Sequence, residues 1–258
     1  MKRIRFEYVT SLKLSVPAKE HCFSIRVLPR STPRQRIQEL SFSLFPKTAV
    51  WENSDSYGNK IISGRYDFYH LHFQFTLSGT AITDCTAIDK SGLLDCYRYP
   101  SRLTMPGSEI TQFYNAIKDE LGDSPYERAM NASARLYEIF SYEQAVTNVK
   151  TTAEEAFKQK KGVCQDYAHI FLSLMRLDGI ACRYAAGLFA GEGQTHGWAE
   201  IFDGGWIGID PTNNCRVGDD YIRLSHGRDF SDSAIDRGVI YSLSSQIQTV
   251  SAFLTEEK

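Results

Sequence analysis

The chain has 258 residues, with 29 lysines and arginines against 31 aspartates and glutamates, so its formal net charge is −2. A chain this close to neutrality lacks the positive charge that non-specific binding to a phosphate backbone needs, which argues against a nucleic-acid partner. The composition, 42% hydrophobic and 23% charged, is typical of a globular protein and not of a disordered one.

The cysteines raise the question of a disulfide framework. An even number of cysteines suits a short secreted chain, but a chain of this length has enough core-forming residues to fold without one. The N-terminus is basic without a following apolar run, and no stretch approaches the roughly 20 apolar residues of a membrane span. We therefore expect a protein of the reducing cytoplasm, without a membrane partner. The six cysteines are Cys22, Cys85, Cys96, Cys164, Cys182 and Cys215.

The first hundred residues predict strands. Apolar residues alternate with polar ones from Phe23 to Val27 and again from Leu71 to Leu77, which places each apolar set on one sheet face. Several short strands separated by turn residues indicate a β-rich, sandwich-like N-terminal domain over residues 1–105. His70 and His72 lie in the second run without further ligands, so we expect them to face solvent, and no metal site is predicted.

Helical signals follow Pro106. Ser108 is a candidate cap for a helix that reaches Leu121, and two capping boxes start further helices. Another helix opens at Gly162-Val163-Cys164 and ends at Asp178-Gly179, where glycine supplies the left-handed cap. The two capping boxes are Ser124-Pro125-Tyr126-Glu127 and Thr152-Ala153-Glu154-Glu155.

Beyond Gly179 the pattern returns to strands. We expect five of them, and helices followed by an antiparallel sheet make residues 106–258 an α+β domain. The expected strands cover residues 181–189, 196–202, 206–210, 221–224 and 247–253.

Cys164 is placed for nucleophilic chemistry. At a helix start, the unpaired backbone N–H groups and the helix dipole favour the thiolate, and the same N–H groups suit a developing oxyanion. A thiolate still needs a proton shuttle for the leaving group, and His196 at the head of a strand is the candidate. Asp210, at the end of the next strand, is the candidate to orient the imidazole.

The register of the hairpin tests whether His196 and Asp210 meet. If Asp203-Gly204-Gly205 forms a three-residue loop, residue 202 faces 206 and Asp210 becomes a diagonal neighbour of His196 on one face. Diagonal pairs lie roughly 7–8 Å apart, within reach of two polar side chains. A two-residue loop would place the two side chains on opposite faces.

These residues also resemble the bacterial transglutaminase-like superfamily, whose order is cysteine, histidine, aspartate. The resemblance is carried by Gly162-Val163-Cys164-Gln165-Asp166-Tyr167-Ala168-His169, Gly179-Ile180, Arg183-Tyr184, His196-Gly197-Trp198-Ala199-Glu200, Trp206, Asp210-Pro211-Thr212, Gly227-Arg228-Asp229-Phe230-Ser231-Asp232 and Arg237-Gly238-Val239. Together these motifs cover about residues 135–245. The resemblance implies a papain-like core, in which a helix presents the cysteine and a sheet presents the histidine and aspartate.

The resemblance also implies the chemistry, which is acyl transfer through a thioester on Cys164. His196 would act as general base and then as general acid, and Asp210 would orient it. Among the upstream side chains, Tyr142 is our candidate for the oxyanion hole, together with the Cys164 backbone N–H.

Three further residues are assigned more peripheral roles. Gln165, beside the nucleophile, is a second and weaker candidate for the oxyanion donor. Trp198 and Trp206 are expected to line the cleft.

Several competing signals are set aside. His169 lies five residues after Cys164 on the same helix and therefore points away from the thiol. The run from Asn53 has tyrosine and glycine where a calcium loop needs ligands. The glycine-rich run 191–196 has a histidine in place of the third glycine of a phosphate loop, and we interpret it as a loop that leads His196 into the cleft.

The leading hypothesis is a cysteine-dependent hydrolase of amide or peptide bonds, with a peptide or protein substrate and no cofactor. The first alternative is a transglutaminase that transfers the acyl group to a primary amine. The second is a catalytically idle protein-interaction module with the same fold, against which the intact cysteine, histidine and aspartate speak. The sequence leaves the substrate and the oligomeric state open.

Overall fold

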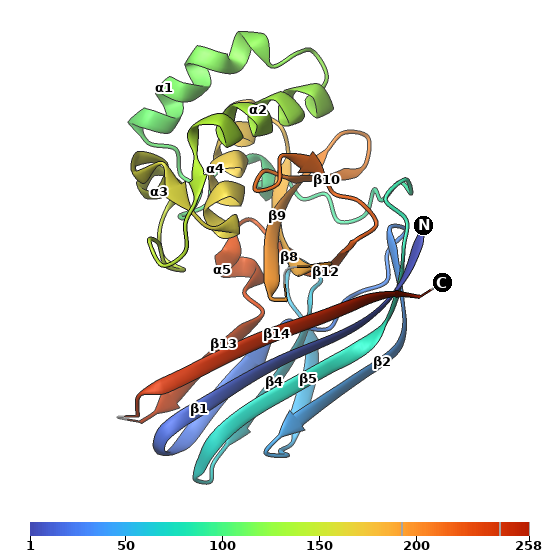
Figure 1. Cartoon of the computed structure of the whole chain (residues 1–258), viewed down its shortest axis with the longest axis vertical. Coiled ribbons are helices and arrows are strands. Elements are labelled where there is room, and N and C mark those ends of the chain that lie inside the picture. Colours follow the sequence, from blue (N-terminus) through green and yellow to red (C-terminus); the bar gives the residue numbers. More distant parts are fainter. Residues whose placement is uncertain (192, 243, 258) are drawn as a thin grey trace.

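The computed structural model describes residues 1–191, 193–242 and 244–257. A helix-rich part that contains a five-stranded sheet sits on a long, strand-built part (Figure 1). Glu192, within the predicted loop before His196, lies outside the described residues. In the described part of the chain, no helix is both long and apolar enough to cross a membrane.

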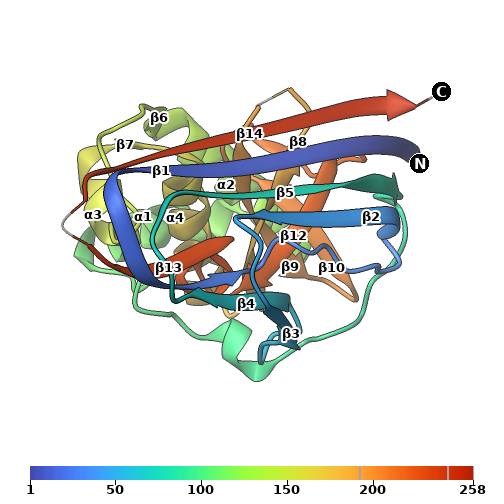
Figure 2. The same cartoon turned by 90° about the horizontal axis from the view of Figure 1, so that it is seen from below.

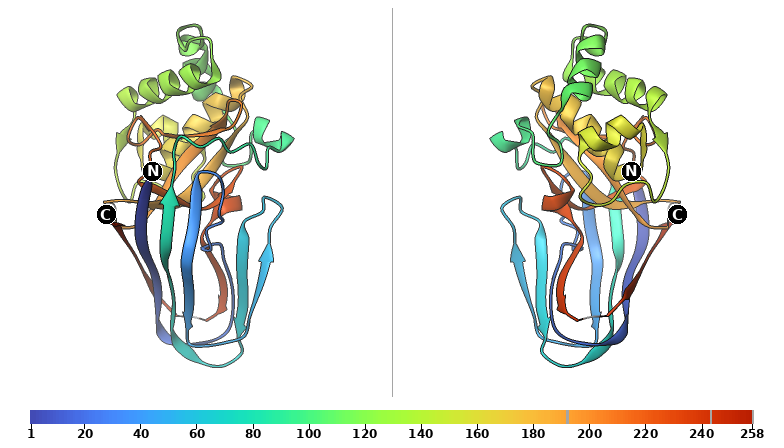
Figure 3. Two further views of the ribbon diagram at one scale, coloured as in Figure 1. Left: turned by 90° about the vertical axis from the view of Figure 1, so that its right-hand side faces the viewer. Right: turned by 90° about the vertical axis from the view of Figure 1, so that its left-hand side faces the viewer.

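The strand-built part is organised around one very long strand. β1 (Lys2–Ile25) pairs with β5 and β14 along its first half and with β4 and β13 along its second half. The two groups of strands form facing layers that share β1 (Figures 2 and 3). The other strands are β2 (Gln35–Phe45), β3 (Val50–Ser54), β4 (Lys60–Tyr66), β5 (His70–Thr83), β13 (Asp236–Tyr241) and β14 (Gln246–Glu257).

Period-two alternation explains which side chains fill the space between these layers. Phe23, Phe73, Phe75 and Leu77 are buried, as the sequence predicts. Leu71 shares the parity of the last three but is 52% exposed, because it lies near the register shift between β1 and β5.

The prediction that His70 faces solvent is wrong. Its ring is buried and stacks on His21, with His21 Nδ1 3.1 Å from His70 Nε2. Burial lowers the pKa of His21 to about 4 and also lowers the pKa of His70, so both rings are neutral near pH 7. Adjacent strands of the sandwich bring the two rings together, which the pattern of one strand does not reveal.

The last two strands depart from the predicted division at residue 105. β13 and β14 belong to the sandwich, and β14 pairs with β1 from Arg3↔Glu257 to Leu14↔Gln246. Residues 106–258 therefore do not form one separate unit, since the end of the chain returns to the first sheet (Figure 1). Neither strand is distinguishable from a strand of the second sheet by its own hydrophobic pattern.

The helices begin largely where the capping signals place them. Both capping boxes are present, at Ser124 with Glu127 and at Thr152 with Glu155. Ser108 is not a cap: Gly107 is the N-cap of the first helix, and the Glu154 carboxylate accepts hydrogen bonds from its first backbone N–H groups. The helices are α1 (Ser108–Ile117), α2 (Pro125–Ile139), α3 (Ala153–Gln159), α4 (Cys164–Leu177) and α5 (Phe230–Ser233), with short 3-10 turns at Asp95–Arg98 and Lys118–Glu120.

The five-stranded sheet is antiparallel and carries α4 on one face. Its strand order is β11-β10-β9-β8-β12, and a short parallel pair, β6 with β7, precedes α4. The strands are β6 (Ser141–Tyr142), β7 (Lys161–Gly162), β8 (Cys182–Phe189), β9 (Thr195–Phe202), β10 (Trp206–Asp210), β11 (Cys215–Arg216) and β12 (Tyr221–Gly227).

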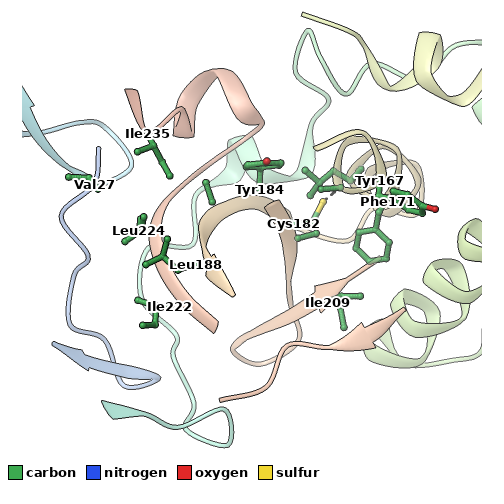
Figure 4. Packing of buried hydrophobic residues seen from close by; sticks show 14 of the residues in the cluster. Val27, Tyr167, Phe171, Cys182, Tyr184, Leu188, Ile209, Ile222, Leu224 and Ile235 are labelled. Atoms are coloured by element: carbon green, nitrogen blue, oxygen red, sulfur yellow. Dashed lines mark hydrogen bonds between the residues drawn. The ribbon is translucent and has the colours of Figure 1, made fainter. Parts of the chain in front are cut away.

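One continuous core joins the two parts. Phe171 of α4 packs near Cys182 and Tyr184 of β8, and the cluster continues to Val27 and Ile235 at the boundary with the sandwich (Figure 4). Because interior packing resists changes of spacing, this core fixes the start of α4 relative to the sheet.

Candidate active site

Cys164 is the first residue of α4, and its position is fixed by the residues around it. The Asp166 carboxylate accepts a hydrogen bond from the Val163 backbone N–H at 2.8 Å and another from the Thr147 hydroxyl at 2.6 Å. A side chain at Gly162 would collide with that carboxylate, so glycine is required there. The predicted helix start is therefore confirmed, with the thiol partly exposed at the positive end of the helix dipole.

The β9–β10 hairpin has the predicted three-residue register. Phe202 pairs with Trp206 and Ala199 with Ile209, so His196 and Asp210 become diagonal neighbours on the same face. His196 Nε2 lies 2.8 Å from Asp210 Oδ2, and both side chains are inaccessible to solvent.

Asp210 is held by more partners than the sequence indicated. Its Oδ2 accepts hydrogen bonds from the Asn213 amide and the Tyr221 hydroxyl, each at 2.8 Å, besides the bond to His196. Its Oδ1 accepts from the backbone N–H groups of Thr212 and Asn213. Burial favours the neutral acid, but these hydrogen bonds outweigh it and hold the pKa of Asp210 below its usual value. The carboxylate is therefore ionised at neutral pH.

A cavity of about 560 Å³ opens beside these residues. Cys164, Gln165 and His196 line it from the helix start and from β9. Tyr8 of β1 and Val250 of β14 line it from the sandwich, so both parts of the molecule form its walls. The other lining residues are Arg102, Val149, Lys150, Val163, Tyr184, Ala186, Thr195, Gly197, Phe230, Ser231, Ala234, Ile235, Asp236, Arg237 and Gln248.

The remaining predicted site residues lie elsewhere. Tyr142 pairs with Gly162 through its backbone, but its side chain is 53% exposed and does not line the cavity. Trp198 is buried behind His196, with the two ring centroids 6.3 Å apart. Trp206 lies at the opposite end of the hairpin and covers the Arg183 guanidinium, 3.8 Å from its ring centroid.

The structure adds residues that the sequence analysis missed. Tyr184 lines the cavity, and its hydroxyl lies over Gly197, where a side chain would collide with it. The contact of Asn213 with Asp210 could have been predicted from the sequence, because a turn after Asp210 brings the residue three positions later back to the carboxylate. Tyr221 comes from β12, and only the tertiary fold shows its contact.

His169 has a structural contact, in agreement with its exclusion as a base. Its ring is fully buried, and Nε2 accepts a hydrogen bond from the Phe230 backbone N–H at 3.1 Å. Burial lowers its pKa to about 4. Within the described ranges there is also no group of three or more His, Cys, Asp or Glu side chains that is placed to hold a metal ion.

A helix that starts at a cysteine and packs on an antiparallel sheet bearing a His–Asp pair defines the transglutaminase-like class of fold. The chain belongs to the transglutaminase-like superfamily. The family model of that superfamily matches residues 115–211, and the bacterial transglutaminase-like N-terminal region matches residues 4–81.

The chain is also similar to one solved structure and to two mycobacterial proteins. A structure described as a "putative cysteine protease" from Cytophaga hutchinsonii superposes with a TM-score of 0.80 at 19% identity, over 100% of this chain and 91% of that one. An uncharacterized protein of Mycobacterium tuberculosis is 28% identical over 252 residues, which is 83% of this chain and 80% of the relative. An uncharacterized protein of Mycobacterium leprae is 25% identical over 270 residues, or 93% of each chain.

Proposed function

We propose that this protein is a cysteine-dependent hydrolase of amide or peptide bonds. The observation that carries the proposal is the hydrogen bond between His196 and the ionised, buried Asp210. His196 in turn lines the same cavity as Cys164, which starts a helix. A purely structural histidine or cysteine would not need to line a shared cavity.

The chemistry runs in two steps. In the first, the Cys164 thiolate attacks the substrate carbonyl carbon, a thioester forms, and His196 donates its proton to the departing amine. In the second, His196 removes a proton from water, the water attacks the thioester, and the thiol is released with a carboxylic acid. Because Nε2 is engaged by Asp210, the proton passes through Nδ1 of His196.

The oxyanion of each tetrahedral intermediate needs donors beside the sulfur. The Cys164 backbone N–H at the helix start supplies one. Gln165 is the better second candidate, since its side chain lines the cavity whereas that of Tyr142 does not. Thiolate chemistry requires Cys164 to remain reduced, which suits the cytoplasm as the compartment.

The test first measures how fast iodoacetamide labels each thiol and then measures cleavage of peptides by variants of the protein. With all six thiols unpaired, iodoacetamide should modify Cys164 faster than the other five near neutral pH, as read by peptide mass spectrometry. Cys164→Ala should abolish cleavage of a peptide library without changing the unfolding temperature. The matched control is Cys22→Ala, because the Cys22 thiol is exposed, and this variant should keep full activity. Cys182→Ala does not serve as a control, because the Cys182 thiol is buried. Unselective labelling, or turnover by Cys164→Ala at the wild-type rate, would overturn the proposal.

The same assay decides between water and an amine as acceptor. Addition of a primary amine leaves the hydrolysis products dominant if water is the acceptor. Dominant amine adducts would mean that the protein is a transglutaminase and not a hydrolase, and the proposed thioester intermediate would still hold.

A further inference from the structure

A second cavity, of about 350 Å³, lies where the sandwich meets the catalytic sheet. It shares no lining residue with the cavity at Cys164. Both parts of the chain and the segment between them contribute to its wall. The lining residues are Arg30, Ser31, Thr32, Pro33, Tyr57 and Asn59 from the sandwich, Ser91 and Gly92 from the connecting segment, and Arg183, Arg223, Leu224 and His226 from the sheet.

Positive charge dominates this cavity. Arg183 and Arg223 share one carboxylate, Glu200, through hydrogen bonds of 2.7 Å and 2.6 Å. Arg30 adds a third guanidinium at the rim and donates to the Gly58 carbonyl. A second acid, Asp89, lies 4.0 Å from Arg223.

His226 adds no charge, because burial and the nearby guanidinium groups lower its pKa to about 2. Three guanidinium groups therefore face two carboxylates, which leaves one positive charge in excess. Glu200 and Asp89 balance the two guanidinium groups of the sheet, so the charge in excess is that of Arg30, which is exposed at the rim and accessible to an anion.

Arg183 has unused hydrogen-bonding capacity at this place. It is 1% exposed, and its Nη2 has no hydrogen-bond partner among the residues that the structure describes. The Arg183 charge also acts on the buried hydroxyl of Tyr97, which does not line this cavity. Trp206 stacks on the guanidinium and fixes its plane. A buried donor such as Arg183 Nη2 is normally satisfied, so it points to a group that the protein binds.

We propose that the cavity binds a small organic oxyanion, with Arg183, Arg223 and Arg30 as its cationic contacts. The hydroxyls of Ser31 and Thr32 are additional donors on the wall. Carboxylates and phosphate monoesters share the required chemistry, since guanidinium pairs with either in two parallel hydrogen bonds. The volume leaves room for an organic body beyond the anionic group.

Such a ligand bridges the two parts of the molecule. Arg30 belongs to the sandwich, and Arg183 and Arg223 belong to the catalytic sheet. Binding should therefore raise the unfolding temperature in proportion to the logarithm of the ligand concentration. This inference does not depend on the activity proposed for Cys164.

The test measures binding of inorganic phosphate, glycerol phosphate and citrate to the full chain by titration calorimetry. Arg30→Gln removes one rim charge without opening a hole in the core, and its dissociation constants should rise about tenfold. Arg36→Gln removes another exposed arginine, outside the cavity, and is the matched control, for which no change is expected.

The probes separate the two sources of the oxyanion. Binding of the phosphates alone, or of citrate alone, assigns the class of ligand. The absence of heat with every probe at about 10 mM, or equal affinities of wild type and Arg30→Gln, would overturn the proposal. Equal unfolding temperatures of the ligand-free variants and wild type show that the fold is intact.

Discussion

Asp210→Asn tests the catalytic arrangement most directly. The backbone N–H groups of Thr212 and Asn213 donate to Oδ1 and will hold the amide oxygen of the new side chain at that position. The amide NH2 then takes the place of Oδ2, where it meets His196. To avoid two facing donors, the imidazole must accept at Nε2 and carry its proton on Nδ1, the nitrogen that serves Cys164 in the proposed mechanism.

The expected loss has two components. A hydrogen bond from imidazolium to a carboxylate contributes about 1.5–3 kcal/mol, and the substitution removes it. The shift of tautomer adds to this, and in serine-protease triads the corresponding change lowers kcat by about 10⁴. We therefore expect kcat/KM to fall between about 10²- and 10⁴-fold, or about 3–5 kcal/mol.

The assay is steady-state cleavage of the best peptide from the library, with the unfolding temperature as a measure of fold. Tyr221→Phe is the matched control, because it removes one donor to the same Oδ2 and leaves the tautomer alone. Its loss should stay below about tenfold. If Asp210→Asn keeps kcat/KM within about threefold of wild type while folded, His196 does not act through Asp210 and the mechanism is wrong.

Three further predictions concern the architecture around the site. Asp166→Ala removes the cap on the Val163 N–H and should lower the free energy of unfolding by about 1–2 kcal/mol in urea titrations; an unchanged midpoint would contradict the cap. Gly197→Ala places a methyl against the buried Tyr184 hydroxyl and should destabilise the protein by about 1–3 kcal/mol, whereas wild-type stability would mean that the ring moves aside. Burial raises the pKa of Asp236 to about 6, so the folded state holds a proton that the unfolded state loses near pH 4, and stability falls as the pH rises from 4 to above 6. Asp236→Asn should remove this fall and gain up to about 3 kcal/mol above pH 7; parallel pH profiles of the two proteins would contradict it.

Local signals predicted the parts of the site that local chemistry determines. Two capping boxes, the helix start at Cys164 and the left-handed glycine at Gly179 all follow from residues within one turn of each other. The His196–Asp210 pair was predictable because a three-residue loop and period-two alternation together fix the register of a hairpin.

The residues whose positions were predicted wrongly are placed by contacts with residues that are distant in the sequence. Trp206 is the first residue of the strand that ends at Asp210, so it lies at the far end of that strand, over Arg183. Tyr142 lies beside β7 through its backbone alone, and nothing in its neighbourhood indicates where the ring points. His70 alternates as a surface residue would, and its partner His21 is 49 residues away.

Because the end of the chain returns to the first sheet, the sandwich forms part of the wall of the cavity at Cys164. β14 lies along β1 over twelve paired positions, and these two strands contribute Tyr8, Gln248 and Val250 to the cavity wall. Under the proposed function, the sandwich is therefore part of the surface that a substrate would meet at Cys164, because its residues line the same cavity as Cys164. In the proposed hydrolase, residues far from the superfamily motifs would consequently set specificity, while the motif residues would carry out the chemistry. The long pairing of β1 with β14 keeps that wall in register with the helix start through one continuous core.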